Sequence, residues 1–128
     1  MNVSLLDRLS GLQEDLIQVV YSTNRRTSRV GDEEEYFRSQ KHPCISPPGW
    51  HLGHCAYIEC LWIREILTGD NCIDQDLRNF YTPELSAKGD RGFLLPPCNQ
   101  LIEWARALMR ENCERMSDSS FWIKKNNF

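Results

Sequence analysis

The chain has 128 residues, which is the usual size of one folded domain and too short for two independent ones. Lysine and arginine total 15 against 18 aspartates and glutamates, so the formal net charge is −3. This balance argues against nucleic acid as a partner, because phosphate backbones are bound by basic surfaces. We therefore expect a single domain over residues 1–128.

The start of the chain carries neither a signal-peptide core nor a membrane span. Asp7 and Arg8 interrupt the first apolar residues, and a span needs about 20 consecutive apolar residues. Six cysteines could form three disulfides in an exported protein, but without an export signal they indicate reduced thiols. No Cys-x-x-Cys pair occurs, which argues against a zinc knuckle or a thioredoxin-like site. We expect a cytoplasmic protein that is not bound to a membrane.

Apolar residues recur at the spacing of amphipathic helices in three segments, expected over about residues 4–27, 48–68 and 97–116. Prolines favour the start of the second and third segments, and Gly69 favours the end of the second. The second segment is apolar nearly all round, which predicts a central helix. The apolar stripe of the first segment comprises Leu5, Leu9, Leu12, Leu16 and Val19.

The sequence between these segments is less regular. The acidic residues 32–35 are expected to form a solvated face or loop, and residues 71–97 are long for a loop, with a short helical turn over about 74–80. Residues 121–123 could pack on the bundle or form a short strand. No fourth long helix is predicted, although such helices normally form bundles of four. Either three helices close on themselves, or another segment or chain covers the gap.

All three histidines lie within thirteen residues of one another, and two of them share a helix face. His51 and His54 are three positions apart, and Glu59 follows about one turn later. Neutral imidazole is the commonest metal ligand, so this face is a candidate metal site. The alternative is structural: His51 would be a hydrogen-bonded residue at the helix end, and His54 a buried histidine stacked near Trp50.

The stretch Ser46-Pro47-Pro48-Gly49-Trp50-His51-Leu52-Gly53-His54, followed by Glu59 and Trp62, resembles a family signature. It is similar to the start of the second helix in the DinB-like domain of ergothioneine-type and selenoneine-type sulfoxide synthases, which are non-haem iron enzymes. The resemblance implies an all-α, DinB-like up-down helical bundle, of which this chain would be the N-terminal part. It further implies that His54 is one of three histidine ligands of Fe(II), with His51 and Glu59 in supporting positions around the metal site.

The resemblance continues through Asn79-Phe80-Tyr81 and through residues 88–97. In the family, a basic pair there contacts the carboxylates of a small thiol substrate. Lys88 and Arg91 match this pair, although the family usually has arginine at the first position, and lysine lacks the planar fork that binds carboxylates bidentately.

The chain departs from the family pattern after the third helix. The family's other two iron ligands form a His-x-x-x-His pair on a fourth helix, whereas no histidine follows His54 here. The catalytic base region and the larger C-terminal domain of those enzymes have no counterpart either, so no catalytic residue is assigned. We expect a partial DinB-like domain that is not catalytic alone and is covered by a second chain or by self-association.

Two other functions remain open from the sequence. A non-catalytic helical module would use the groove left by the missing helix to bind a partner, because uncovered apolar surface marks interaction sites. A remnant of a DinB-like, metal-dependent thiol transferase would use a metal to lower the pKa of a thiol, and it would need the same later histidines.

Overall fold

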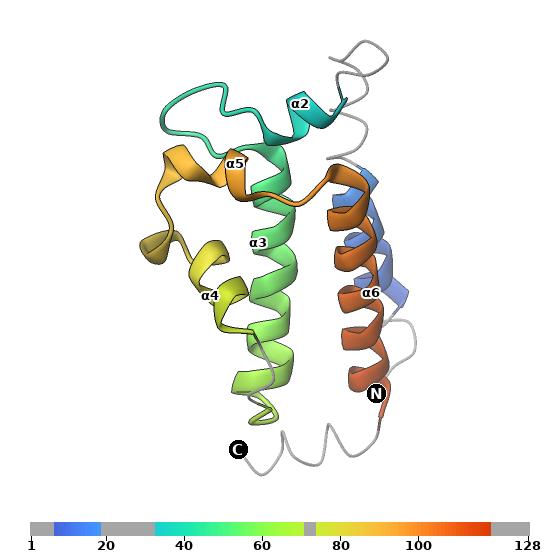
Figure 1. The fold of residues 1–128 in the computed structure, drawn as a ribbon. Helices are drawn as coiled ribbons and strands as arrows, with labels where there is room; N and C mark the ends of the chain where they lie inside the picture. The colour runs from blue at the N-terminus through green and yellow to red at the C-terminus, as the bar shows by residue number, and fades with distance from the viewer. Residues whose placement is uncertain (1–6, 19–32, 71–73, 119–128) are drawn as a thin grey trace.

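The computed structural model describes residues 7–18, 33–70 and 74–118 of the chain, and helices dominate all three segments (Figure 1). Residues 7–18 lie in an N-terminal helix. The further elements are α2 (Glu33–Arg38), α3 (Pro48–Cys60), the π-helix η1 (Leu61–Ile66), α4 (Gln75–Tyr81), the 3₁₀-helices η2 (Pro83–Leu85) and η3 (Lys88–Asp90), α5 (Arg91–Leu94) and α6 (Cys98–Ser117). The described segments contain no β-strand, which confirms the all-α class. None of their helices is long and apolar enough to cross a membrane.

The central helix begins and ends where the sequence predicts. Pro48 occupies its first turn, where a missing N–H costs nothing, and α3 continues through η1 to Ile66. Gly69 then adopts a φ of +72°, a left-handed conformation that suits glycine, and its N–H donates to the carbonyl of Glu65. The third expected helix is confirmed as α6, within one residue at each end.

The long helices do not alternate strictly in direction. Arg64 of η1 donates to Glu111 of α6 over 2.7 Å, and Asp70 pairs with Arg115 over 3.0 Å, so α3 and α6 run in parallel (Figure 1). The expected up-down alternation is therefore wrong for this pair. The physical reason is the long connection, because residues 74–97 return along the bundle through α4 and α5 before α6 begins.

Within the described residues the acidic run is helical rather than a loop, and its exposed Glu35 fits the expected solvated face. It opens α2, whose Phe37 is fully buried against Gly49 of α3. One oxygen of Glu34 accepts a hydrogen bond from the backbone N–H of Cys98 over 2.8 Å, at the first residue of α6. A carboxylate at this position satisfies an otherwise unpaired donor and complements the helix dipole.

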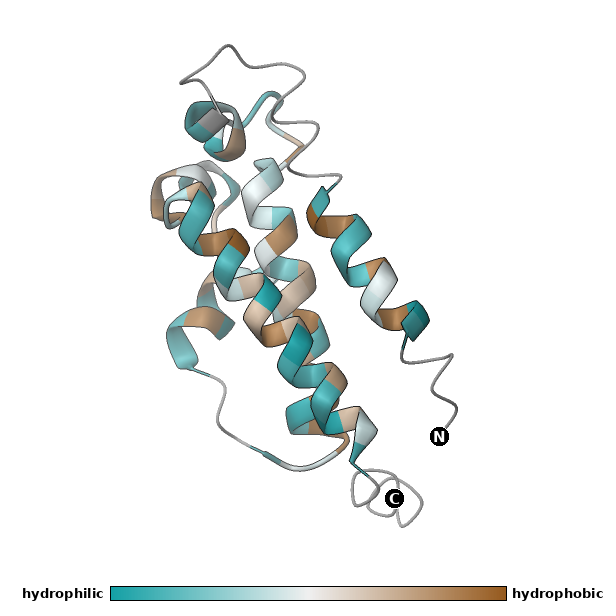
Figure 2. Cartoon of the chain, turned by 90° about the vertical axis from the view of Figure 1, so that its right-hand side faces the viewer, coloured by the Kyte–Doolittle hydropathy of each residue, from teal (hydrophilic) through white to brown (hydrophobic). Residues whose placement is uncertain are grey.

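The N-terminal helix is rotated relative to the predicted stripe. Ile17 and Gln13 are buried, whereas Leu12 is 67% exposed. Trp62 of η1, the tryptophan that follows the Ser46–His54 stretch, is 53% exposed. Hydrophobic and hydrophilic residues still alternate along the N-terminal helix and along α6, as amphipathic packing requires (Figure 2). The expected ends of the first helix, residues 4–6 and 19–27, and the possible strand at 121–123 lie outside the described residues.

Candidate functional site

The first turns of α3 contact the C-terminal end of α4. The indole Nε1 of Trp50 donates to the carbonyl oxygen of Phe80 over 2.9 Å, and Nδ1 of His54 lies 2.7 Å from the carbonyl oxygen of Tyr81. The last carbonyls of a helix lack partners within the helix. Two side chains of α3, one turn apart, therefore satisfy consecutive carbonyls at the end of α4.

Gly53 makes this close approach possible. The ring of Tyr81 lies directly over the α3 backbone at Gly53, where even a Cβ atom would overlap it. Tyr81 is 2% exposed, and burial raises the pKa of its phenol far above the ordinary value. The glycine within Trp50-His51-Leu52-Gly53-His54 thus has a packing role that brings α4 to the histidine.

Two contacts determine the orientation of the His54 ring, one with the Trp50 indole and one with the carbonyl of Tyr81. The ring plane lies parallel to the Trp50 indole, with 4.9 Å between ring centroids and 7° between planes. Because a carbonyl oxygen only accepts hydrogen bonds, Nδ1 of His54 must carry the proton, which leaves a lone pair on Nε2. No residue among those described hydrogen-bonds to Nε2, and the side chain is half-buried. Metal-binding histidines commonly hold their second nitrogen in this way.

Arg91 is buried against Trp50, on which His54 is stacked, and it is not exposed to a substrate. Its guanidinium lies 3.9 Å from the Trp50 ring centroid, and it is 3% exposed. It donates to the hydroxyl oxygens of Ser46 over 2.7 Å and Ser86 over 3.1 Å, and to the carbonyl of Pro83 over 3.1 Å. The expectation that Arg91 binds a thiol's carboxylate is therefore corrected, because its donors already hold the α4–α5 connection onto α3.

His51 and Lys88 lie at the surface near Arg91. The His51 ring meets Trp50 edge-on, with 5.6 Å between centroids, and Nζ of Lys88 donates to the carbonyl of Cys44 over 3.0 Å. Partial burial lowers the pKa of His51, and repulsion from the protonated form of His54 and from the charges of Arg91 and Lys88 lowers it further. His51 is thus a neighbour of the His54–Trp50 pair, and Lys88 is an exposed cation on the same side of α3.

Glu59 does not join the histidines. Glu59 lies five positions after His54, which places it about 140° farther round an α-helix. It contacts the other helices instead: one carboxylate oxygen accepts from Gln13 over 2.6 Å and from Asn112 over 3.0 Å. Burial raises the pKa of Glu59, while these two hydrogen bonds act in the opposite direction. The expected supporting role of Glu59 at the metal site is therefore corrected to a bridge between three helices.

The partners of Glu59 in this bridge are not predicted by the sequence pattern. Asn112 is fully buried on α6, and its Oδ1 accepts from Nε of Arg64 over 3.0 Å. Gln13 also donates to the carbonyl of Met109 and accepts from the Cys113 thiol. Each of these polar residues lies among apolar helix positions, and that interruption is the only signal in the sequence that could have pointed to them.

A complete three-histidine iron site is not formed by the described residues. The other two histidines make different contacts: the His51 ring meets Trp50 edge-on, and Nδ1 of His42 accepts from the backbone N–H of Cys44 in an exposed loop. No group of three His, Cys, Asp or Glu side chains in residues 7–18, 33–70 and 74–118 could hold a metal ion. The residues present do not fit a closed iron site, and no catalytic step through iron is derived.

Comparison with protein-family models, with curated proteins and with solved structures found no match. The DinB-like family, the iron ligand and the thiol substrate consequently remain expectations from the motif. The contacts of His54, Trp50 and Tyr81 provide the independent basis on which the function of this site can be argued.

Proposed function

We propose that this chain is a partial DinB-like domain in which His54 supplies one imidazole ligand to a metal centre of the Fe(II) type. The remaining ligands would come from a polypeptide segment outside the described residues, so the chain is not catalytic alone. The observation that carries this proposal is the 2.7 Å contact between Nδ1 of His54 and the carbonyl of Tyr81, which leaves Nε2 as the metal-binding nitrogen.

Preorganisation of the ring supports this assignment. A ligand that is already held by stacking and a hydrogen bond loses little conformational freedom when a metal binds. The Trp50 ring and the Arg91 guanidinium behind it form the support on which His54 lies. In this reading Arg91 acts on the site through Trp50, and it does not contact a substrate.

A small thiol substrate belongs to the same proposal. Lys88 is the exposed cation beside His51, and among the described residues its ammonium group donates to the carbonyl of Cys44. An ammonium group at this place could bind a carboxylate of the thiol as a point charge, without the bidentate geometry of arginine.

A helical interaction module is the second candidate, and exposed apolar side chains favour it. Leu12 and Trp62 are 67% and 53% exposed although they belong to long helices of the bundle. Large exposed apolar residues on packed helices mark surfaces that bind other protein segments. The two candidates are compatible, since a second chain or a second copy of this chain that covers these residues could also bring the missing ligands.

Equilibrium dialysis against ferrous iron under anaerobic conditions tests the proposal. The unmodified chain should take up more iron than His54→Ala, and it should lose that iron on desalting because one imidazole does not retain a metal ion. His42→Ala removes an exposed loop histidine and serves as the matched control, with uptake equal to that of the unmodified chain. Equal uptake by the unmodified chain and His54→Ala would overturn the proposal.

A further inference from the structure

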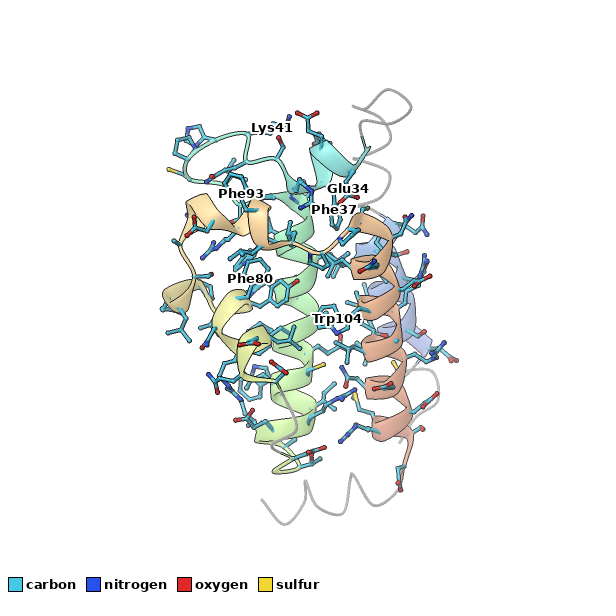
Figure 3. The ribbon with its side chains drawn as sticks, in the orientation of Figure 1. Glu34, Phe37, Lys41, Phe80, Phe93 and Trp104 are labelled. Atoms are coloured by element: carbon cyan, nitrogen blue, oxygen red, sulfur yellow. The ribbon has the colours of Figure 1, made fainter. Side chains whose placement is uncertain are left out.

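A cavity of about 920 Å³ lies between α4 and α6, and His54 is not among the described residues that line it. Its wall includes residues of α4, the η2–α5 connection and the first half of α6. Figure 3 shows Phe80 of α4 and Trp104 of α6 pointing into the space between these two helices. The volume is at the upper end of the range of small-molecule sites, roughly 300–1,000 Å³.

Aromatic rings form a continuous wall of this cavity. Tyr81 is stacked with Trp104 at 5.8 Å between centroids and 18° between planes, and Phe80 meets Tyr81 at 4.7 Å. Leu77 and Leu101 extend the apolar surface on either side. Such a wall favours a flat, apolar ligand body, because aromatic rings bury large areas and prefer stacked or edge-on contacts.

The charged residues of the wall all have the same sign. Asp74 and Asp76 come from the start of α4, Asp90 comes from η3, and all three are exposed. No lysine, arginine or histidine is among the described residues that line the cavity. Two arginines lie close behind the wall: Arg78 is paired with Glu65 of η1, and Arg91 is buried between Trp50 and the lining residue Ser86. The cavity therefore combines an apolar aromatic interior with a negative potential, which attracts cations and repels anions.

We infer that this cavity binds a small organic cation in which a protonated primary amine is joined to a flat aromatic body, an arylalkylamine. The aromatic body packs on Phe80 and Trp104, whose rings contact the buried Tyr81, while the ammonium group lies among the aspartates. An ammonium near both carboxylates and aromatic faces gains from both interactions. An aromatic carboxylate of the same shape binds more weakly, because its charge is repelled.

Three related probes separate charge from shape: tryptamine, which is cationic, indole-3-acetate, which is anionic, and neutral 3-methylindole. Binding is followed by ¹H–¹⁵N NMR of the whole chain. Tryptamine should perturb the resonances of Phe80, Tyr81 and Trp104, with a dissociation constant of about 1 mM, as expected for a ligand of about a dozen non-hydrogen atoms. Indole-3-acetate should bind at least about tenfold more weakly, and 3-methylindole should fall between the two.

Two exposed carboxylates provide variants that do not disturb the core. In the double variant Asp76→Asn and Asp90→Asn, the affinity for tryptamine should fall several-fold, and the preference over indole-3-acetate should shrink. Glu103→Gln makes the same kind of change on α6 beside a different cavity, and it should leave tryptamine binding unchanged. Equal binding of tryptamine and indole-3-acetate, perturbations away from the aromatic wall, or an effect of Glu103→Gln equal to that of the double variant would overturn the inference.

Discussion

Trp50 and His54 lie one turn apart on α3 with their rings parallel, and Nε1 of Trp50 and Nδ1 of His54 are hydrogen-bonded to the consecutive carbonyls of Phe80 and Tyr81. The two residues nevertheless differ in burial, since Trp50 is 3% exposed and His54 is half-buried. Trp50 therefore contributes mainly to the stability of the fold, whereas His54 retains a nitrogen that is available to a ligand.

This difference in burial predicts that replacing Trp50 with alanine lowers the free energy of unfolding more than replacing His54 does. Trp50→Ala should lower the free energy of unfolding by about 3–5 kcal/mol through the cavity that it leaves. His54→Ala should lower it by only about 1–2 kcal/mol, the scale of one hydrogen bond and a partial loss of packing. Urea unfolding measures both values. Similar losses in the two variants would show that His54 is a core residue and would remove the distinction.

Gly53 offers a second test of how α4 is held. Gly53→Ala inserts a methyl group where the Tyr81 ring lies, so we expect a loss of about 1–3 kcal/mol from overpacking. Gly11→Ala is the matched control, because Gly11 lies in the N-terminal helix with open space around its Cβ position. That change should stabilise the protein by about 0.5–1 kcal/mol through helix propensity. A stabilising Gly53→Ala would contradict the contact with Tyr81.

Arg91 should behave as a structural residue. Arg91→Lys keeps the charge but cannot reach Ser46, Ser86 and Pro83 together, so we expect a loss of about 2 kcal/mol from buried groups left without partners. Arg106→Lys provides the comparison, since Arg106 forms an exposed pair with Glu14 and its replacement should cost less than about 1 kcal/mol. Thermal unfolding without any ligand distinguishes the two. Equal, small effects would return Arg91 to a substrate-binding role.

The raised pKa of Glu59 predicts the direction in which the stability of the fold changes with pH. Because its pKa is raised above the ordinary value of 4.5, the folded chain binds this proton more tightly than the unfolded chain. The contribution of Glu59 to stability is therefore greatest below the ordinary value, and it falls as the pH rises from there through the raised value.

Glu59→Gln removes this titration while Oε1 can still accept from Gln13 and Asn112. We expect the variant to be more stable than the unmodified chain at pH 7, with a flatter stability profile above pH 4.5. Glu114→Gln, an exposed change on α6, should leave the profile unaltered. Denaturant unfolding across this pH range measures the difference, and a less stable Glu59→Gln at pH 7 would refute the prediction.

Local signals in the sequence predicted the long helices well. Proline at the start of α3 and glycine after η1 act through the backbone of their own turn, so their effect needs no knowledge of the rest of the chain. The role of Glu34 could not be predicted in this way, because the N–H that it caps is 64 residues away. The exposure of Leu12 likewise depends on which side of its helix α6 occupies.

The residues of the candidate site show the same contrast between features that local spacing predicts and features that depend on distant parts of the chain. The spacing of Trp50 and His54 indicates that they can stack, and the structure shows them stacked. The family resemblance and the distance along the helix place Glu59 with them, whereas its angle round the helix directs it to Gln13 and Asn112. The burial of Arg91 arises from the path of the α4–α5 connection, which no pattern in the sequence indicates.

The protonation of the His54 ring tests the central claim most directly. Long-range ¹H–¹⁵N correlation spectra of the imidazoles, recorded near neutral pH, identify which nitrogen carries the proton. We expect His54 to carry it on Nδ1, and we expect added Zn²⁺, a diamagnetic probe, to shift Nε2 of His54 while the Nδ1 proton is retained. A proton on Nε2, or a response to Zn²⁺ confined to His42 and His51, would contradict the assignment of His54 as the metal ligand.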